Sequence, residues 1–211
     1  MELIQYLERH FYNRQELLAL SKVTTEELLK YQQQEMMPNC SYRVSFELKS
    51  DSFFGAHQEA HETEYYAKGY ASWLGIVKTL ESKEHVYEHF YQRYIRKIAE
   101  LKKLGHWSDD PKVNAQIDLH ISSEWKYFLD GTYGLCTQSG LPEDIAAKEL
   151  AILEINQLSS EESLTVEQTA QLTKAVNLLD EASSLFAPHE RPKSSRQRLI
   201  NDIRRRFQLS A

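Results

Sequence analysis

The sequence predicts a mostly α-helical protein of about seven to eight helices, with a small β element near residues 41–48. Three observations lead to this fold class. Glycine and proline are scarce, with seven and five residues in a chain of 211, whereas an all-β fold needs a turn every ~8–12 residues. Apolar residues recur at three- and four-residue steps over most of the chain, which is the period of amphipathic helices. One short stretch instead alternates apolar and polar residues, as a half-buried strand does.

The first forty residues read as three short helices. Asn13 is placed to cap the second helix, and Glu16 occupies the position that completes a capping box. Thr24 or Thr25 can cap the third helix in the same way. Two helices joined by a short turn have a helix-turn-helix outline. Residues 1–40 are therefore predicted to form a helix-turn-helix-like N-terminal unit.

The stretch QELLALSKVTTEELLKYQQQEMMP, about 25 residues, resembles the N-terminal half of MerR-type winged-helix domains, in which such a helix pair precedes a short wing. The resemblance implies DNA binding. However, Lys22 stands where the turn usually has a glycine, and Glu26 and Glu27 begin the helix that would contact bases. Carboxylates at that place repel phosphates. The sequence therefore favours a structural or protein-contact role for this unit, with DNA binding as the alternative.

The next element is the only clear strand signal. Apolar Tyr42, Val44, Phe46 and Leu48 alternate with polar residues, and a loop from Asp51 to Gly55 follows. Beyond this loop the apolar spacing predicts helices. One helical stripe consists of Tyr66, Tyr70, Trp73, Val77 and Leu80, and the next consists of Tyr87, Tyr91, Tyr94, Ile98 and Leu101. Further helices are expected over residues 111–129, 142–157, 165–186 and 194–208.

The net charge of −6 is unevenly distributed. From Pro188 onward, seven Arg and Lys residues against two acids give the tail a charge of about +5, which leaves about −11 for the rest. We expect this basic tail to dock on its own acidic body, and contact with nucleic acid, an acidic partner or a membrane surface is the alternative. The predicted divisions are residues 1–40, a helical body at 41–187 and a basic C-terminal helix at 188–211, packed as one globular protein.

Cysteine content and hydropathy indicate the compartment. Cys40 and Cys136 are too few for a disulfide framework, which favours a reducing cytoplasm. The N-terminal MELIQYLERHFY lacks a positively charged segment followed by an apolar run, so we expect no secretion signal. No apolar stretch approaches the ~18 residues that span a bilayer. The sequence therefore predicts a cytoplasmic protein without a membrane partner.

Two histidine pairs have the spacing of metal ligands. His57 with His61 and His85 with His89 are each four residues apart, which places two imidazoles on one face of a helix. The helical phase, however, turns both pairs away from the apolar stripes, and neither pair matches the HExxH pattern. We therefore interpret them as surface histidines and predict neither a metal site nor a cofactor.

The densest chemistry lies in the segment from Gly105 to Asp144. Helix caps account for much of it, because Asp110 and Pro111 begin a helix and Gly131 ends one. The helix between them is predicted to carry Asn114 within its apolar stripe of Ile117, Ile121, Trp125 and Phe128, with Asp118 and Glu124 on the flanks. A long glycine-rich loop is expected at residues 131–141. The candidate ligand-binding residues are Trp107, Asp109, Asn114, Asp118, Trp125, Tyr133 and Cys136.

Two of these residue types allow other interpretations than ligand binding. A buried carboxylate on this helix could be held by an ion pair, with Arg93 or a tail arginine as the partner. Cys136 could instead act as a nucleophile beside His106, His120, Asp118 or Asn114. Buried cysteine is the commoner fate of such a residue, so we favour a structural role for Cys136.

A second resemblance spans nearly the whole chain. The segments GHWSDDPKVNAQID, EWKYFLDGTYGLCTQSGLPEDIAAKELAI and FAPHERPKSSRQRLINDIRRRF resemble an uncharacterised family of proteobacterial proteins that are labelled as natural-product biosynthesis proteins. The resemblance implies a bacterial origin and a role beside a biosynthetic pathway, and it supplies no catalytic residues. We therefore expect a non-catalytic accessory or binding protein that holds a small molecule or a protein partner at residues 105–144. A DNA-binding regulator and a metal- or thiol-dependent enzyme are the alternatives.

Overall fold

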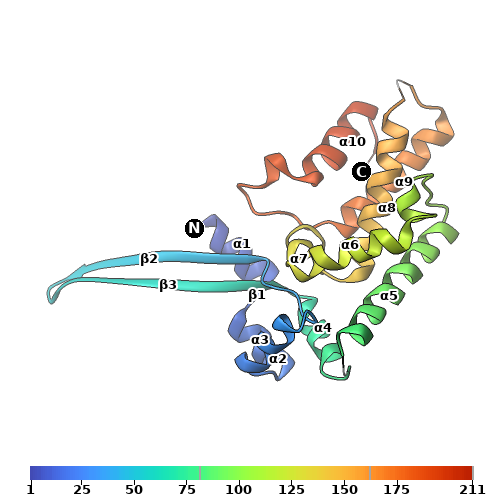
Figure 1. The fold of residues 1–211 in the computed structure, drawn as a ribbon. Helices are drawn as coiled ribbons and strands as arrows, with labels where there is room; N and C mark the ends of the chain where they lie inside the picture. Colours follow the sequence, from blue (N-terminus) through green and yellow to red (C-terminus); the bar gives the residue numbers. More distant parts are fainter. Residues whose placement is uncertain (81, 162, 211) are drawn as a thin grey trace.

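The computed structural model describes residues 1–80, 82–161 and 163–210. Over these residues it is mostly helical, with 61% helix, ten α-helices and a three-stranded antiparallel sheet. The mostly helical prediction is thus confirmed, and the predicted number of helices was too low. Figure 1 shows the helices gathered into one body, from which a long β-hairpin projects.

The N-terminal unit forms as the capping signals predict. Its elements are α1 (Glu2–His10), β1 (Phe11–Asn13), α2 (Arg14–Ser21) and α3 (Thr25–Gln33). The Asn13 side chain accepts from the Glu16 amide at 2.9 Å, and the Glu16 carboxylate accepts from the Asn13 amide at 2.9 Å. Thr24 and Glu27 form the same reciprocal pair at the start of α3. These two capping boxes satisfy amides that a helix start leaves without partners.

Two long strands follow, β2 (Tyr42–Ser52) and β3 (Gly55–Ala67), in a sheet of order β1-β3-β2. The strand predicted near residues 41–48 is correct and extends further. The helix predicted to follow Gly55 is wrong over residues 55–67, because β3 pairs with β2 from Ser52↔Gly55 to Tyr42↔Tyr65 and with β1 as far as Ala67. The sheet also spans the predicted division at residue 40, since Phe11 pairs with Ala67; that division stays a prediction.

The remaining helices form the body. They are α4 (Tyr70–Val77), α5 (Lys83–Lys103), α6 (Ile117–Leu129), α7 (Thr132–Cys136), α8 (Pro142–Ser159), α9 (Val166–Ala182) and α10 (Asp202–Phe207), the last preceded by a π turn at Gln197–Asn201. Two boundaries differ from expectation. The helix predicted at 111–129 is split into a 3₁₀ turn, Pro111–Val113, and α6, because the Asp110 cap and Pro111 start only a single turn. The loop predicted at 131–141 contains α7.

The core of the body is an aromatic cluster that joins α4, α5 and α6. Trp73, Phe90, Trp125 and Phe128 are all buried. Their ring centroids lie 4.9 Å apart for Trp73 and Phe128, and 5.1 Å apart for Phe90 and Trp125. Both pairs are edge-to-face, and such pairs contribute ~0.5–1.5 kcal/mol each beyond their area burial. Trp125, a candidate ligand contact, is thus part of this core.

The basic tail docks on the body. Arg196 and Arg204 both pair with Asp180 of α9, the latter at 2.8 Å between Nη1 and Oδ2. Ile200 and Ile203 are buried against α8 and α9. Of the two interpretations of the tail, the structure therefore shows docking on the chain's own body, with Asp180 as the acidic contact. Among the described residues, no helix is long and apolar enough to cross a membrane.

Candidate functional site

Asn114 lies in the loop before α6 and is not part of the apolar stripe of that helix. It lies just after the 3₁₀ turn, and α6 begins three residues later. Its amide donates to the carbonyls of Ser108 and Asp110, both at 2.8 Å, and its Oδ1 accepts from Lys102 at 2.9 Å. The expectation that Asn114 lies within the apolar stripe is wrong, because the helix starts later than its periodicity suggests. These hydrogen bonds fix the loop that precedes α6.

Three other predicted site residues lie at the surface. Asp109 is exposed and accepts from Gln157 of α8 at 3.0 Å, and Trp107 is 45% exposed. Asp118 is exposed and accepts from the Tyr91 phenol at 2.5 Å. The arginine expected as a partner for this helix is engaged elsewhere, since Arg93 forms two 2.7 Å hydrogen bonds with Glu143. No shared partner joins Trp107 and Asp109 to Asp118 in the described structure.

Tyr133 belongs to a buried polar cluster instead. Its phenol donates to Glu124, a carboxylate that is 5% exposed. His120 Nε2 lies 3.8 Å from Glu124 and 3.6 Å from Glu149. Burial raises the pKa of Glu124 to about 7, although the Tyr133 hydrogen bond opposes this, and burial lowers the pKa of His120. The carboxylate that burial perturbs is thus Glu124, on the flank of α6 opposite to Asp118.

Cys136 is half-buried at the end of α7, and its carbonyl accepts from the buried Lys148 ammonium at 2.6 Å. The histidines considered as its partners have carboxylate neighbours. His106 Nδ1 lies 2.9 Å from Glu154, and His120 faces the cluster described above. The described structure therefore shows no hydrogen bond between the Cys136 thiol and either imidazole.

The four spaced histidines lie on two different kinds of element. His57 and His61 are exposed on β3, not on a helix, and they share a face because strand side chains repeat every two residues. On α5, His85 is exposed, while His89 is half-buried with its ring centroid 6.0 Å from that of Trp73. Within the described residues, no group of three or more His, Cys, Asp or Glu side chains is arranged to hold a metal ion.

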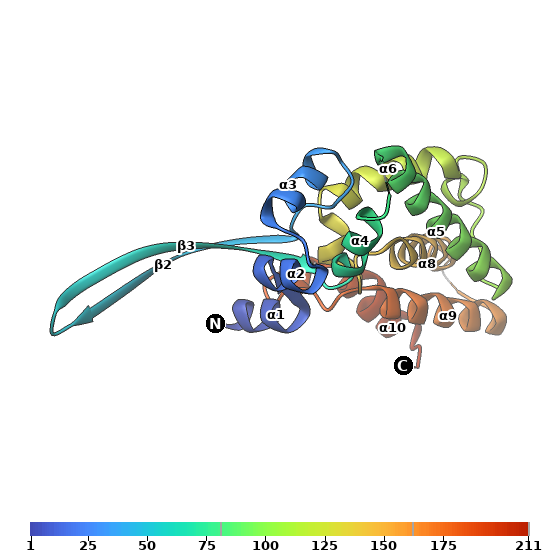
Figure 2. The ribbon, with the colours of Figure 1, turned by 90° about the horizontal axis from the view of Figure 1, so that it is seen from below.

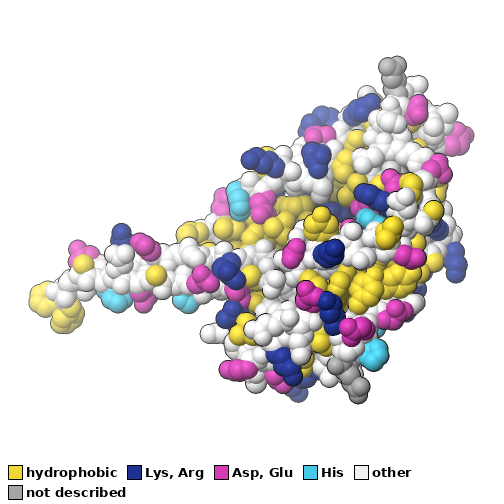
Figure 3. All heavy atoms as spheres, in the orientation of Figure 1, with side chains coloured by type: hydrophobic (Ala, Val, Ile, Leu, Met, Phe, Trp, Pro, Cys, Tyr) yellow, Lys and Arg dark blue, Asp and Glu magenta, His cyan; other side chains and the backbone are white. Residues whose placement is uncertain are grey.

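The hairpin is the feature that the helical prediction did not contain. We call residues 42–65 the arm. Figure 2 shows that it curves away from the helices over most of its length. The turn between its strands carries Phe53 and Phe54, whose exposed fractions are 97% and 96%. In Figure 3 the far end of the arm is hydrophobic. Exposed apolar side chains that are grouped together mark sites of interaction.

The arm has two chemically different faces. Register places Tyr42, Val44, Phe46 and Leu48 opposite Tyr65, Thr63, His61 and Glu59, and we call this the apolar face. Phe46 is 37% exposed and Leu48 45% exposed. The charged face carries the other six charged residues of the arm, Arg43, Glu47, Lys49, Asp51, Glu62 and Glu64. The arm as a whole has a net charge of −3.

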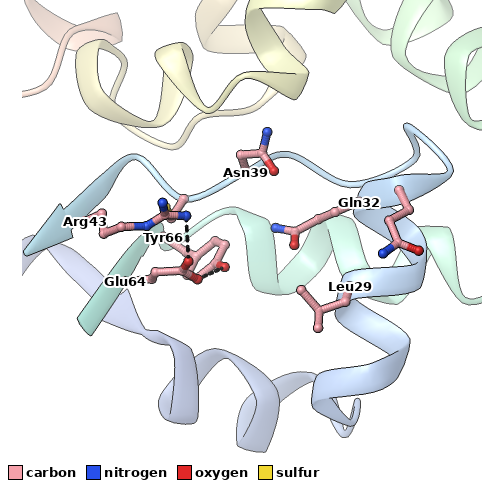
Figure 4. Close-up of a pocket in the computed structure, with 8 residues that line it drawn as sticks. Leu29, Gln32, Asn39, Arg43, Glu64 and Tyr66 are labelled. Atoms are coloured by element: carbon pink, nitrogen blue, oxygen red, sulfur yellow. Dashed lines mark hydrogen bonds and ion pairs between the residues drawn. The ribbon is translucent and has the colours of Figure 1, made fainter. Parts of the chain in front are cut away.

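Glu64 anchors the charged face at the root of the arm. Its carboxylate accepts from Arg14 at 2.5 Å, from Arg43 at 3.1 Å and from the Tyr66 phenol at 2.6 Å. Burial alone would raise the pKa of Glu64, but these three donors outweigh it and hold the pKa below its ordinary value. Figure 4 shows Arg43, Glu64 and Tyr66 across a pocket of about 320 Å³ from Gln32 of α3.

A second hollow lies beside the apolar face at the root of the arm. A groove of about 510 Å³ lies between α1 and the arm. Its lining is mixed: Met1, Ile4, Phe46 and Tyr65 supply the apolar part, and the charged or polar part comes from Glu8, Asn13, Arg14, Gln15, His61, Glu62, Thr63 and Glu64. Tyr42 continues the same face into the core, with its ring centroid 5.1 Å from that of Phe11. The apolar face therefore runs without interruption from the buried core, past this groove, to Leu48.

Comparison with known proteins gives a family. A family of unknown function, DUF6058, matches residues 86–208, which is more than half of the chain. The chain belongs to this family. The matched region of this DUF6058 protein contains most of α5 and all of α6 to α10. The arm and the N-terminal unit precede it. No curated protein and no solved structure matches the chain.

The DUF6058 chain thus has a candidate interaction site that the sequence did not predict. Its strongest sequence signal was the pair Phe53-Phe54 directly before Gly55, inside what reads as a loop. A second signal was the alternation from Tyr42 to Leu48, which predicts a strand with one buried face. Beyond Val44, the β2 residues of that face are exposed in the part of the chain that the structure describes.

Proposed function

We propose that this protein is a binding protein that engages a protein partner through its arm. The observation that carries the proposal is the combination of an apolar face, open at Phe46 and Leu48, with two almost fully exposed phenylalanines at the tip. Single exposed apolar residues are ordinary on a protein surface, but a continuous apolar strip is the usual mark of a contact surface.

The order of elements supports a winged-helix relation for the N-terminal unit. A helix, a short strand, two helices and a hairpin follow one another, and the first strand pairs with the last. In this comparison, α2 and α3 are the helix-turn-helix pair and the arm takes the place of the wing. The resemblance of residues 15–38 to MerR-type domains agrees with this order. The wing would be unusually long, with eleven residues in β2 and thirteen in β3.

Charge favours a protein over duplex DNA as the occupant. The arm has a net charge of −3, and α3 begins with the exposed carboxylates of Glu26 and Glu27. DNA binding depends on cations that displace counterions from phosphates. A wing and a recognition helix with acidic surfaces repel the DNA backbone instead. A protein partner with an apolar groove does not have this conflict.

The interpretations based on other segments stay predictions. Residues 105–144 could form a second contact surface, because Trp107 is about half exposed beside the loop that Asn114 fixes. An association with natural-product biosynthesis rests on sequence resemblance alone, and the family description gives no activity. The proposal for the arm requires neither of them.

The arm is tested with the double variant Phe53→Ser/Phe54→Ser in the cells from which the protein comes. The expected result is that the native protein runs in gel filtration above its chain mass of 24.7 kDa, and that the double variant does not. The control is Leu119→Ser, which removes a leucine that is 73% exposed on α6 and far from the arm in sequence. A complex that persists in the double variant would contradict the proposal.

The alternative of DNA binding is tested in parallel. We expect no shift of a random 30-base-pair duplex at ~50 mM salt, where non-specific electrostatic binding is strong. A shift that disappears steeply as salt increases would favour the regulator alternative and contradict the protein-binding proposal for the N-terminal unit.

A further inference from the structure

The apolar face and the tip together need a partner with two matching features. The partner must offer an apolar strip for Phe46 and Leu48, and a hollow for Phe53 and Phe54. The chain itself possesses both, because its own arm is such a strip and its own groove beside α1 is such a hollow. Within one copy, the tip is separated from this groove by the length of the arm. Strand residues rise ~3.4 Å each, so the seven steps from Phe46 to Phe53 span roughly 24 Å.

We infer that the occupant of the arm is a second copy of this chain, in a two-fold dimer whose arms lie antiparallel with their apolar faces in contact. This inference rests on the proposed function of the arm and names its partner. In this arrangement the tip of each arm reaches the root of the other. Phe53 and Phe54 of each copy enter the groove beside α1 of the other copy, against the apolar part of its lining, while the charged part of the lining stays at the rim.

The buried area is sufficient for a stable pair. A phenylalanine that passes from full exposure to burial covers ~150–250 Å², so the four tip rings of a dimer bury roughly 600–1,000 Å². The exposed parts of Phe46, Leu48 and Met1 add to this from both copies. The total reaches the ~1,200 Å² at which stable interfaces begin. The groove, at about 510 Å³, lies within the range of pockets that accept drug-sized groups.

The charges of the arm agree with this geometry. Six of its seven charged residues lie on the charged face, which stays in water when the apolar faces meet. Glu59 is the one carboxylate on the apolar face. A two-fold contact is also closed, so it does not extend into a fibre as open edge-to-edge pairing can.

Sedimentation of the purified full-length chain tests the inference. We expect a dimer for the native protein and for Leu119→Ser, and a monomer for Phe53→Ser/Phe54→Ser. Loss of tip residues with hot-spot character weakens such a contact by at least ~100-fold. Circular dichroism should be unchanged, because both side chains are almost free of contact with the rest of the chain. A native chain that is monomeric up to high concentration, or a double variant that still dimerises, would overturn the inference.

A photo-crosslinker identifies the occupant directly. With Phe54→p-benzoylphenylalanine, we expect a dimer-sized adduct whose linked peptide comes from residues 1–15 or 61–65. A dimer linked through other residues would overturn the arrangement. If the purified chain is monomeric and the adduct in cell extract contains a different protein, the second copy is excluded while the proposed function stands. If the chain is monomeric and its arm sediments with neutral or anionic vesicles, both proposals fail.

Discussion

The phenol of Tyr133 donates a hydrogen bond to the carboxylate of Glu124 in the interior of the helical body. The two residues come from neighbouring helices, α7 and α6, and His120 and Glu149 stand beside them. Burial raises the pKa of Glu124 to about 7, above the value of 4.5 for an ordinary glutamate. The protonated acid is thus the form that the folded protein prefers, and charging it in this place costs stability.

We expect Glu124→Gln to become increasingly stabilising as the pH rises. Because the folded pKa is raised, the contribution of Glu124 is fully present below about pH 4.5 and is lost as the pH rises through about 7. The neutral amide does not suffer this loss. The free energy of unfolding of the variant relative to the native protein should therefore increase by up to about 3 kcal/mol between pH 5 and pH 8. Urea unfolding at both pH values measures it, and a difference that is independent of pH would contradict the assignment.

The opposite pH dependence is expected at the root of the arm. The donors Arg14, Arg43 and Tyr66 hold the pKa of Glu64 below its ordinary value, so its contribution is present above that value and is lost as the pH falls through the folded pKa. Glu64→Gln should reduce the free energy of unfolding by about 1–3 kcal/mol at pH 7, because it removes the buried carboxylate from its ion pairs. The partial exposure of both arginines to solvent keeps the loss below that of a fully buried pair.

Glu62→Gln is the matched control for Glu64. Glu62 also lies beside Arg43, at 3.6 Å, but its side chain is 59% exposed. An exposed pair contributes little, so this variant should change stability by less than about 0.5 kcal/mol. Equal effects of the two substitutions would show that the buried network does not hold the arm root.

The sequence predicted those elements whose signals are local. Asn13 with Glu16 determines a helix start within four residues, and the structure has that capping box. The alternation from Tyr42 to Leu48 likewise predicted β2. The pairing of β2 with β3 could not be predicted in this way. Its turn carries Phe53-Phe54 instead of the Asn-Gly or Asp-Gly that marks two-residue hairpins, and Tyr66 with Tyr70 suggested a helical period across what is a strand and a helix.

The ligand-binding residues predicted on α6 depended on which side of that helix faces the interior, and the sequence determines this poorly. Asp118 and Glu124 lie on opposite flanks of the α6 stripe, and only the fold decides which flank faces inward. Tyr133 of α7 contacts Glu124 directly, and Glu149 of α8 reaches the same cluster through His120. Asp118 stays exposed beside Tyr91. Exposure of the arm is also a property of the whole chain. A period of two predicts a buried face but does not say which molecule buries it.

Gly134 and Gly75 should respond to alanine with opposite signs. A Cβ at Gly134 in α7 would lie 2.0 Å from Ser41 Oγ and 3.0 Å from the Ala67 Cβ. Overpacking of this kind costs ~1–3 kcal/mol, so Gly134→Ala should lower the free energy of unfolding. Gly75 in α4 has nothing within 4 Å of such a Cβ. Gly75→Ala should raise stability by up to ~1 kcal/mol through helix propensity. Thermal unfolding of both variants checks this, and destabilisation by Gly75→Ala would contradict it.

Removal of most of the arm should leave the body folded. We expect that replacing residues 45–62 by Asn-Gly, which joins Val44 to Thr63, changes the free energy of unfolding by less than about 1 kcal/mol. The pair Val44↔Thr63 has the same place in the alternating hydrogen-bond pattern of the antiparallel strands as the pair Ser52↔Gly55, which closes the natural turn. A two-residue turn therefore fits after Val44 as well. The Glu64 network is retained.

The physical reason is that the removed residues bond mainly to one another. Within the arm the strands pair from Ser45↔Glu62 to Ser52↔Gly55, and most of their side chains are exposed. The shortened chain should therefore unfold cooperatively in urea near the native midpoint, and sediment as a monomer. A loss of more than about 3 kcal/mol would mean that the arm packs on its own body in solution. A shortened chain that still formed a dimer would place the contact between copies elsewhere on the surface.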